Sequence, residues 1–191
     1  MDTKPFCEIK VFDDFVPDEF VNGVLAMKDA CQDVSGVVGQ HHDGIRQGTQ
    51  RVLMDDIPML YSVQQKLALY TGIGVDHQEP MLLLKYGEGG YFKPHHDAFG
   101  DGGIYNEAYE KERKRGQRLY SVLIGIQQAE GGGETHFPTK QQKFNLRPKQ
   151  MIYWNGFHEG KVLMDSLHEG MPVTKGEKLV VVCWIRDRPF I

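Results

Sequence analysis

From residue 80 onward the chain consists of short segments rich in β-branched, aromatic and leucine residues. Glycine-rich stretches such as residues 131–133, or single prolines, separate these segments, and no helical pattern lies between them. Consecutive short strands without intervening helices are typical of an antiparallel sandwich or barrel. Tight turns are expected as well, because 22 of the 191 residues are glycine, above the average of roughly 7%. The expected strands are residues 81–86, 119–126, 133–137, 150–154 and 178–186.

The first third of the chain predicts two helices, over residues 17–33 and 58–71. Apolar residues recur there at helical spacing. Pro58 suits the first position of the second helix, and Gly72 suits its end. The polar residues 35–48 between the helices are expected to form a loop. The apolar stripes consist of Phe20, Val24, Met27 and Cys31 in the first helix, and Leu60, Val63, Leu67 and Tyr70 in the second.

Length and charge exclude several classes of protein. We expect one domain over residues 1–191, with helical support from residues 1–75 and a β core over residues 80–188. A net charge of -4 disfavours a nucleic-acid partner. The chain has no apolar run near the ~20 residues that cross a bilayer and no secretion-signal core at residues 1–6, so a membrane partner is not expected and the cytoplasm is the expected location. Three scattered cysteines predict reduced thiols.

Residues 98–117 form a long connection between two expected strands. The segment is rich in glycine at first and then strongly charged. The pairs Glu107/Lys111 and Glu110/Lys114 have the spacing that supports an exposed helical turn. Because connections of this length in compact domains are usually functional, we expect a lid or a mobile insert.

The residues that indicate chemistry begin with His95 and Asp97. Side chains two residues apart in extended backbone project from the same face, so this imidazole and carboxylate can take adjacent positions on a metal ion. His168, just before the last expected strand, is the best candidate for a third ligand. Two histidines and one carboxylate leave open positions that suit Fe(II) activating oxygen. On spacing alone, ordinary surface or core histidines are the simpler interpretation, and we expect it to hold for His41, His42, His77, His136 and His158.

Lys178 opens the last expected strand, where its side chain shares one face with Val180, Val182 and Trp184. A lysine at the end of an apolar face often extends its ammonium group to solvent. If the side chain points inward, its charge needs a partner, and no acidic residue on that face supplies one. The sequence thus leaves two interpretations, a solvated strand end or a site for a small anionic ligand.

Blocks of residues that follow one another in order resemble the prolyl 4-hydroxylase branch of the Fe(II)/2-oxoglutarate-dependent dioxygenases. Residues 86–97 are similar to its Y-x-x-G…Y-x-P-H-x-D block, and residues 118–138 to R-x-x-T-x-L-x-Y-L…E-G-G-E-T-x-F-P. Residues 148–155 resemble P-x-x-G-x-x-x-x-F/W-x-N, and residues 168–186 resemble H-x-G-x-P-V…G-x-K…W-I-R. The resemblance covers roughly residues 81–186.

The resemblance implies a mainly β fold with flanking N-terminal helices, the double-stranded β-helix or cupin-like jelly roll. It implies that His95, Asp97 and His168 hold Fe(II), with 2-oxoglutarate and O2 as cosubstrates and ascorbate as a supporting reductant. Lys178 is then expected to pair with the far carboxylate of 2-oxoglutarate. The remaining cosubstrate residues implied are Tyr86 and Thr135, through their hydroxyls, and Trp184 as a wall of the pocket.

The implied reaction is hydroxylation of an unactivated C–H bond, with C4 of a prolyl residue in a peptide or protein as the leading expectation. Arg118 falls where the family has a substrate-contacting arginine, and Phe92, which replaces a tyrosine, lies near the substrate mouth. The same chemistry on a free amino acid, another side chain or a small metabolite stays open, as does a non-catalytic jelly-roll module with a structural metal. A structural metal does not need the anion-binding set around Lys178. The oligomeric state is open.

Overall fold

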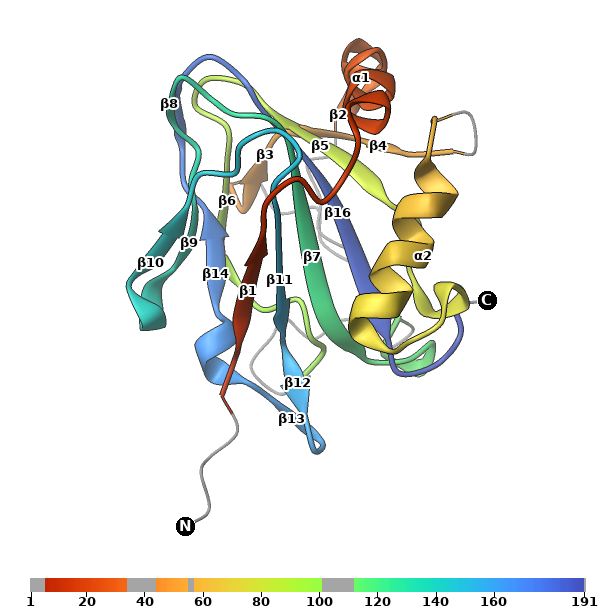
Figure 1. The fold of residues 1–191 in the computed structure, drawn as a ribbon. Helices are drawn as coiled ribbons and strands as arrows, with labels where there is room; N and C mark the ends of the chain where they lie inside the picture. The colour runs from red at the N-terminus through yellow and green to blue at the C-terminus, as the bar shows by residue number, and fades with distance from the viewer. Residues whose placement is uncertain (1–5, 34–43, 55–56, 101–111, 191) are drawn as a thin grey trace.

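The computed structural model describes residues 6–33, 44–54, 57–100 and 112–190. These residues form two antiparallel sheets that enclose a core, with two helices on the outer side of the larger sheet (Figure 1). The larger sheet comprises, in spatial order, β1 (Ile9–Phe12), β11 (Met151–Asn155), β7 (Arg118–Gln127), β16 (Lys178–Arg186), β5 (Leu82–Tyr86), β4 (Thr49–Val52) and β2 (Gln32–Asp33). The smaller sheet comprises β10 (Gln142–Phe144), β9 (Thr135–Phe137), β14 (His168–Gly170), β6 (Tyr91–His95) and β3 (Arg46–Gln47).

Shorter elements complete the description. Two helices have both ends among the described residues, α1 (Asp18–Leu25) and α2 (Leu60–Thr71), and residues 112–114, next to the undescribed residues 101–111, are helical too. Four 3₁₀ turns cover Lys28–Ala30, Val75–His77, Pro138–Lys140 and Met164–Ser166. Two small antiparallel pairs join β12 (Phe157–His158) to β13 (Lys161–Val162), and β8 (Gly131–Gly132) to β15 (Val173–Lys175). No helix in the described ranges is long and apolar enough to span a membrane.

The last strand, β16, shows how the pattern of the sequence builds the layers. Side chains alternate between the two faces of a strand. Val181 and Cys183 pack in the cluster that includes the buried faces of α1 and α2, whereas Val180 and Val182 pack in the cluster between the two sheets. A strand that is buried on both faces has a nearly continuous apolar sequence, as β16 does. The predicted double-stranded β-helix is confirmed.

Both helices are shorter than predicted. The first ends at Leu25, and the chain continues through the 3₁₀ turn Lys28–Ala30 before Cys31 enters extended backbone and strand β2 pairs with β4. The second begins at Leu60 rather than Pro58, because Met59 has a left-handed backbone with φ +63°. Gly72 ends this helix as predicted, with φ +70° and its N–H donating to the carbonyl of Ala68 at 2.9 Å.

Several strands also differ from the prediction. The strand predicted over residues 133–137 starts at Thr135, because Gly133 has φ +76°. Residues 46–47, predicted as part of a loop, form β3, and residues 34–43 lie outside the described residues. Many of the short strands were not predicted as strands at all, among them β1, β4, β6, β10 and β14. The middle of the predicted lid, residues 101–111, lies outside the described part of the chain.

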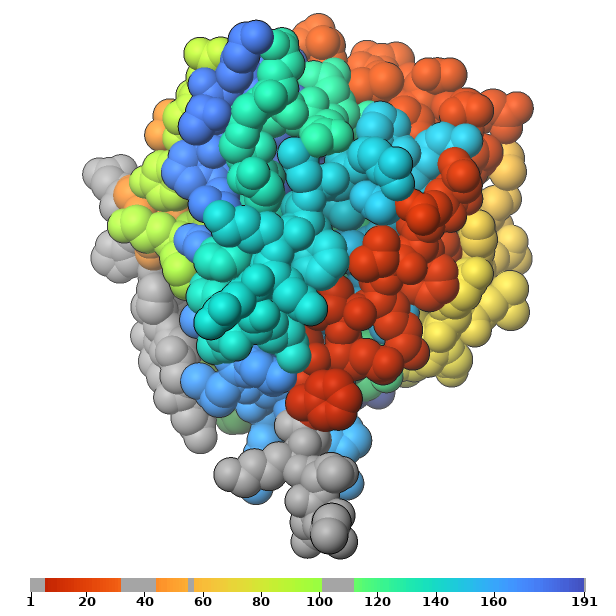
Figure 2. All heavy atoms as spheres, turned by 60° about the vertical axis from the view of Figure 1, so that its left-hand side comes forward, coloured from red at the N-terminus to blue at the C-terminus, as the bar shows by residue number. Residues whose placement is uncertain are grey.

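The N-terminal strand β1 forms one edge of the larger sheet through its pairing with β11. Figure 2 shows the segment around it, in red, lying against the teal region of β9 and β10. The main-chain N–H of Cys7 donates to the Asp165 carboxylate at 3.0 Å, and the ammonium of Lys140 pairs with the same carboxylate at 2.8 Å. Cys7, Cys31 and Cys183 are free thiols, as predicted.

Candidate active site

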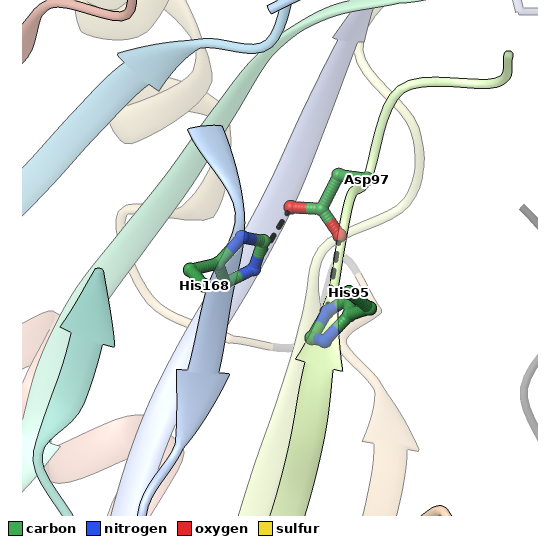
Figure 3. Close-up of side chains that lie close together, drawn as sticks. All are labelled: His95, Asp97 and His168. Atoms are coloured by element: carbon green, nitrogen blue, oxygen red, sulfur yellow. Dashed lines mark ion pairs between the residues drawn. The ribbon is translucent and has the colours of Figure 1, made fainter. Parts of the chain in front are cut away.

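Three side chains from two neighbouring strands meet inside the barrel. His95 ends β6 and His168 begins β14, and the two residues lie directly opposite one another in the register of this antiparallel pair. Asp97 follows two residues after His95. Its Oδ1 lies 3.5 Å from Nε2 of His95, and its Oδ2 lies 3.4 Å from Nε2 of His168 (Figure 3). One candidate ligand atom from each residue lies within 4.8 Å of the others, so the structure brings the predicted metal ligands together.

Hydrogen bonds to the main chain orient both imidazoles. Nδ1 of His95 lies 2.8 Å from the carbonyl oxygen of Lys93, and Nδ1 of His168 lies 3.0 Å from that of Ser166. A carbonyl oxygen can only accept, so each Nδ1 donates its proton to the main chain, and each Nε2 faces Asp97. This is the usual outer support of a metal-bound histidine.

The protonation states also fit a metal site. Burial lowers the pKa of His168 to about 4, so its imidazole is neutral at pH 7. Burial alone raises the pKa of Asp97, but the charge interaction with His168, the hydrogen bond and charge interaction with His95, and the attraction of Arg118 hold this pKa well below its usual range. Metals bind neutral imidazole and ionised carboxylate groups. Two histidines with one carboxylate form the ligand set of non-haem Fe(II) oxygenases.

The cavity beside these residues contains a second charged group, Lys178. Its side chain is 8% exposed and its Nζ donates to Oγ1 of Thr135 at 3.3 Å. No carboxylate of the described residues forms an ion pair with it. Burial lowers the pKa of Lys178 to about 8, against a weaker attraction from Glu134. Of the two interpretations of this lysine, the buried one is correct, and an anionic ligand would supply the missing partner.

The other residues expected around the cosubstrate line the same cavity. Tyr86 is buried, which raises the pKa of its hydroxyl and keeps it protonated as a donor. Thr135 contacts Lys178, and the indole N–H of Trp184 is buried with no hydrogen-bond acceptor among the described residues. Apolar side chains form most of the remaining wall, namely Leu84, Phe92, Leu123, Trp154, Val180 and Val182.

The two expected substrate residues differ in their positions. Phe92 lines the cavity and stacks on His95 with the ring centroids 3.7 Å apart. Arg118 is absent from the described cavity wall. Its Nε and Nη2 donate to the carboxylate of Glu79 at 2.6 and 2.8 Å, and its guanidinium lies 3.8 Å from the centre of the Trp184 ring. A direct contact between Arg118 and the substrate stays a prediction.

The five histidines that were expected to be ordinary surface or core residues lie away from the three converging side chains or outside the described residues. Nδ1 of His136 lies 2.7 Å from the carboxylate of Glu169, on the opposite face of β9 from Thr135. His77 bonds to the main-chain oxygen of Arg186, and His158 is exposed. His41 and His42 lie in the undescribed residues 34–43.

Sequence reasoning missed Arg46. Its guanidinium lies 5.6 Å from the ring centre of Tyr86 and 5.3 Å from that of Phe92, and its Nε and Nη2 are buried without a hydrogen-bond partner in the described structure. Arg46 reaches the cavity region because β3 pairs with β6, in a segment predicted as a loop. Glu79 was missed too, since nothing in its local sequence indicates that it pairs with Arg118 and Arg186.

Comparisons with known proteins agree with this geometry. The model of the 2OG-Fe(II) oxygenase superfamily matches residues 81–186. A protein of Acanthamoeba polyphaga mimivirus is 29% identical over 93% of this chain and 78% of its own length. Prolyl 4-hydroxylase 13 of Arabidopsis thaliana is 29% identical over 79% of this chain, which spans 57% of that enzyme.

A solved structure shows the same fold. The viral collagen prolyl hydroxylase of Paramecium bursaria Chlorella virus-1, solved as its 2OG complex, superposes with a TM-score of 0.71 at 22% identity, covering 93% of this chain and 95% of that one. The predicted resemblance to the prolyl 4-hydroxylase branch is confirmed, as are Fe(II), 2-oxoglutarate and O2, whereas ascorbate stays a prediction. The chain belongs to the 2OG-Fe(II) oxygenase superfamily, and is an enzyme that uses Fe(II), 2-oxoglutarate and O2.

Proposed function

We propose that this enzyme hydroxylates C4 of a prolyl residue in a peptide or protein. The observation that carries the proposal is the buried ammonium of Lys178, which has no carboxylate partner among the described residues and lies in the same cavity as His95, Asp97 and His168. A structural metal does not require a buried cation beside it, whereas a dicarboxylate cosubstrate does. Curated relatives include prolyl 4-hydroxylases of plants, which supports proline as the target.

Each group of residues in the cavity has a distinct role in the proposed reaction. His95, Asp97 and His168 hold Fe(II), which together with 2-oxoglutarate and O2 supplies the oxidising power for attack on an unactivated C–H bond. Lys178 pairs with the far carboxylate of 2-oxoglutarate, and the hydroxyls of Thr135 and Tyr86 donate to the same end. The apolar wall of the cavity excludes water, so that these charges act at full strength.

The region around Phe92 suits a peptide. Nε and Nη2 of Arg46 have no hydrogen-bond partner among the described residues, and a peptide offers carbonyl oxygens that accept from their N–H groups. Phe92 holds an apolar surface directly over His95, where a proline ring can pack. The ion pair between Arg118 and Glu79 lies beside Trp184, where the start of β7 pairs with the end of β16.

The experiment is incubation of the protein with Fe(II), 2-oxoglutarate, ascorbate and a library of proline-containing peptides. Mass spectrometry is expected to find the gain of one oxygen atom, located at proline, together with succinate. Free proline and small metabolites form a second arm, and the His168→Ala variant is the control without activity. Oxidation of a free amino acid but of no peptide contradicts the substrate proposal. An absence of 2-oxoglutarate turnover with every substrate contradicts the whole of it.

A further inference from the structure

Ser121 makes the shortest polar contact to the candidate metal ligands. It lies on β7 between Trp154 and Trp184 of the adjacent strands, and it is 1% exposed. Its hydroxyl donates to Oδ2 of Asp97 at 2.6 Å. This distance is typical of a hydroxyl donating to an ionised carboxylate, a bond about twice as strong as one between neutral groups. Because the serine is buried, water does not compete for it.

The contact makes the two oxygens of Asp97 different. Nε2 of His95 and Nε2 of His168 lie 3.5 and 3.4 Å from its Oδ1 and Oδ2, well beyond the 2.6 Å contact of Ser121. The hydroxyl of Ser121 bonds to Oδ2 alone and leaves Oδ1 directed towards His95. The terminal torsion of an aspartate is otherwise soft, so a bond to one oxygen decides how the carboxylate is rotated.

We propose that Ser121 is a positioning residue of the metal centre, which holds Oδ2 so that Asp97 offers the metal a single oxygen, Oδ1. The inference rests on the proposed function, because it takes the three converging side chains as the metal ligands. If Asp97 offers one oxygen, the metal keeps more of its coordination positions open for other ligands. Three protein ligands leave three octahedral positions, two for 2-oxoglutarate and one for O2. A second oxygen from Asp97 would occupy one of them.

A merely structural role for Ser121 makes a different prediction. In that case its bond to Asp97 only ties β7 to the segment that follows β6, and its loss lowers stability without changing how the site binds metal or cosubstrate. The two roles are separated by ligand binding measured without turnover, because neither metal affinity nor the spectrum of a bound metal depends on activity.

The test uses a matched pair at this position, Ser121→Thr and Ser121→Val, which differ by a hydroxyl at nearly equal volume. Ser121→Ala serves as a second variant that adds no volume. The readouts are Co(II) affinity, the visible spectrum of bound Co(II), 2-oxoglutarate affinity at saturating Co(II), and the thermal stability of the metal-free protein. We expect the threonine variant to retain the wild-type spectrum and affinities within about twofold.

The valine and alanine variants are expected to bind Co(II) about 10- to 100-fold more weakly, the usual effect of removing an outer support of a ligand. They are also expected to show an altered Co(II) spectrum and weaker binding of 2-oxoglutarate. If Ser121→Ala, or Ser121→Val, matches the threonine variant in metal affinity and spectrum and differs only in stability, the proposal is overturned. If wild-type protein binds Co(II) no better than His168→Ala does, the metal site fails with it, and that result identifies the proposed function as the point of failure.

Discussion

Replacing Lys178 with methionine separates its role in ligand binding from its role in the fold. Methionine keeps the length of the side chain and removes the charge. Burial lowers the pKa of Lys178 from its ordinary value of 10.5 to about 8. Each pKa unit corresponds to ~1.4 kcal/mol, so the charged amine costs the folded protein about 3 kcal/mol below pH 8. The variant without ligand is therefore expected to be more stable than wild type by up to this amount.

The same substitution is expected to abolish tight binding of 2-oxoglutarate. Removing one partner of a buried ion pair costs about 3–5 kcal/mol, which corresponds to a loss of affinity of about 100-fold or more. Metal affinity should change little, because the ammonium of Lys178 is not among the converging ligand atoms. Urea unfolding of the metal-free protein gives the stability, and calorimetric titration gives the two affinities.

The pH dependence of the stability difference provides a second check. Between pH 8 and 10.5 the folded protein has released the proton of Lys178 while the unfolded chain still holds it. Stability rises with pH wherever the unfolded state binds more protons. The free energy of unfolding of the wild type should therefore rise relative to that of Lys178→Met over this range, until the two values are equal. A variant that is less stable than wild type at pH 7 and still binds 2-oxoglutarate normally refutes the reasoning.

Two further predictions concern the ligands and the ion pairs around them. His168→Ala should reduce Co(II) affinity by more than the roughly 100-fold caused by removing a residue that only supports a ligand, and its circular dichroism should stay near native. His136→Ala should bind Co(II) like wild type. Equal affinities in titrations of the two variants would contradict the ligand assignment. Glu79→Gln leaves Arg118 and Arg186 without a shared counter-charge and should lower the free energy of unfolding by about 3 kcal/mol. Glu130→Gln, which breaks an exposed pair with Lys175, should change it by about 0.5 kcal/mol, and similar urea midpoints for these two variants would show that burial is not the cause.

Local patterns predicted the elements that carry a clear periodicity. The strand over residues 178–186 has the predicted bounds, because a nine-residue segment buried on both faces is apolar nearly throughout. The end of α2 at Gly72 was predicted because glycine adopts the left-handed backbone conformation that often ends a helix. The short strands β6 and β14 were missed, because five and three residues with a proline, glycines and charged side chains have no periodicity to recognise.

The candidate site was likewise predicted only in part from the sequence. Spacing placed His95 and Asp97 on one face of extended backbone, and local sequence singled out His168 as the best third ligand and Lys178 as the first residue of an apolar strand face. Family resemblance added the role of each. The sequence left open whether Lys178 is buried without a carboxylate partner, as it is among the described residues, because the answer depends on which strands surround its face. The positions of Arg46 and Glu79 were not predicted at all.

The sequence by itself determined the mainly β class of fold, the strands with a clear periodicity and the residue types able to bind a metal and an anion, since these follow from local periodicity and side-chain chemistry. Only the tertiary structure decided which of those residues meet. His168 stands opposite His95 because β14 pairs with β6 in one particular register, and Ser121 reaches Asp97 across 24 positions of sequence because β7 passes beside them. Such contacts arise from the pairing of distant strands, and a one-residue slip in register would turn each of these side chains to the opposite face.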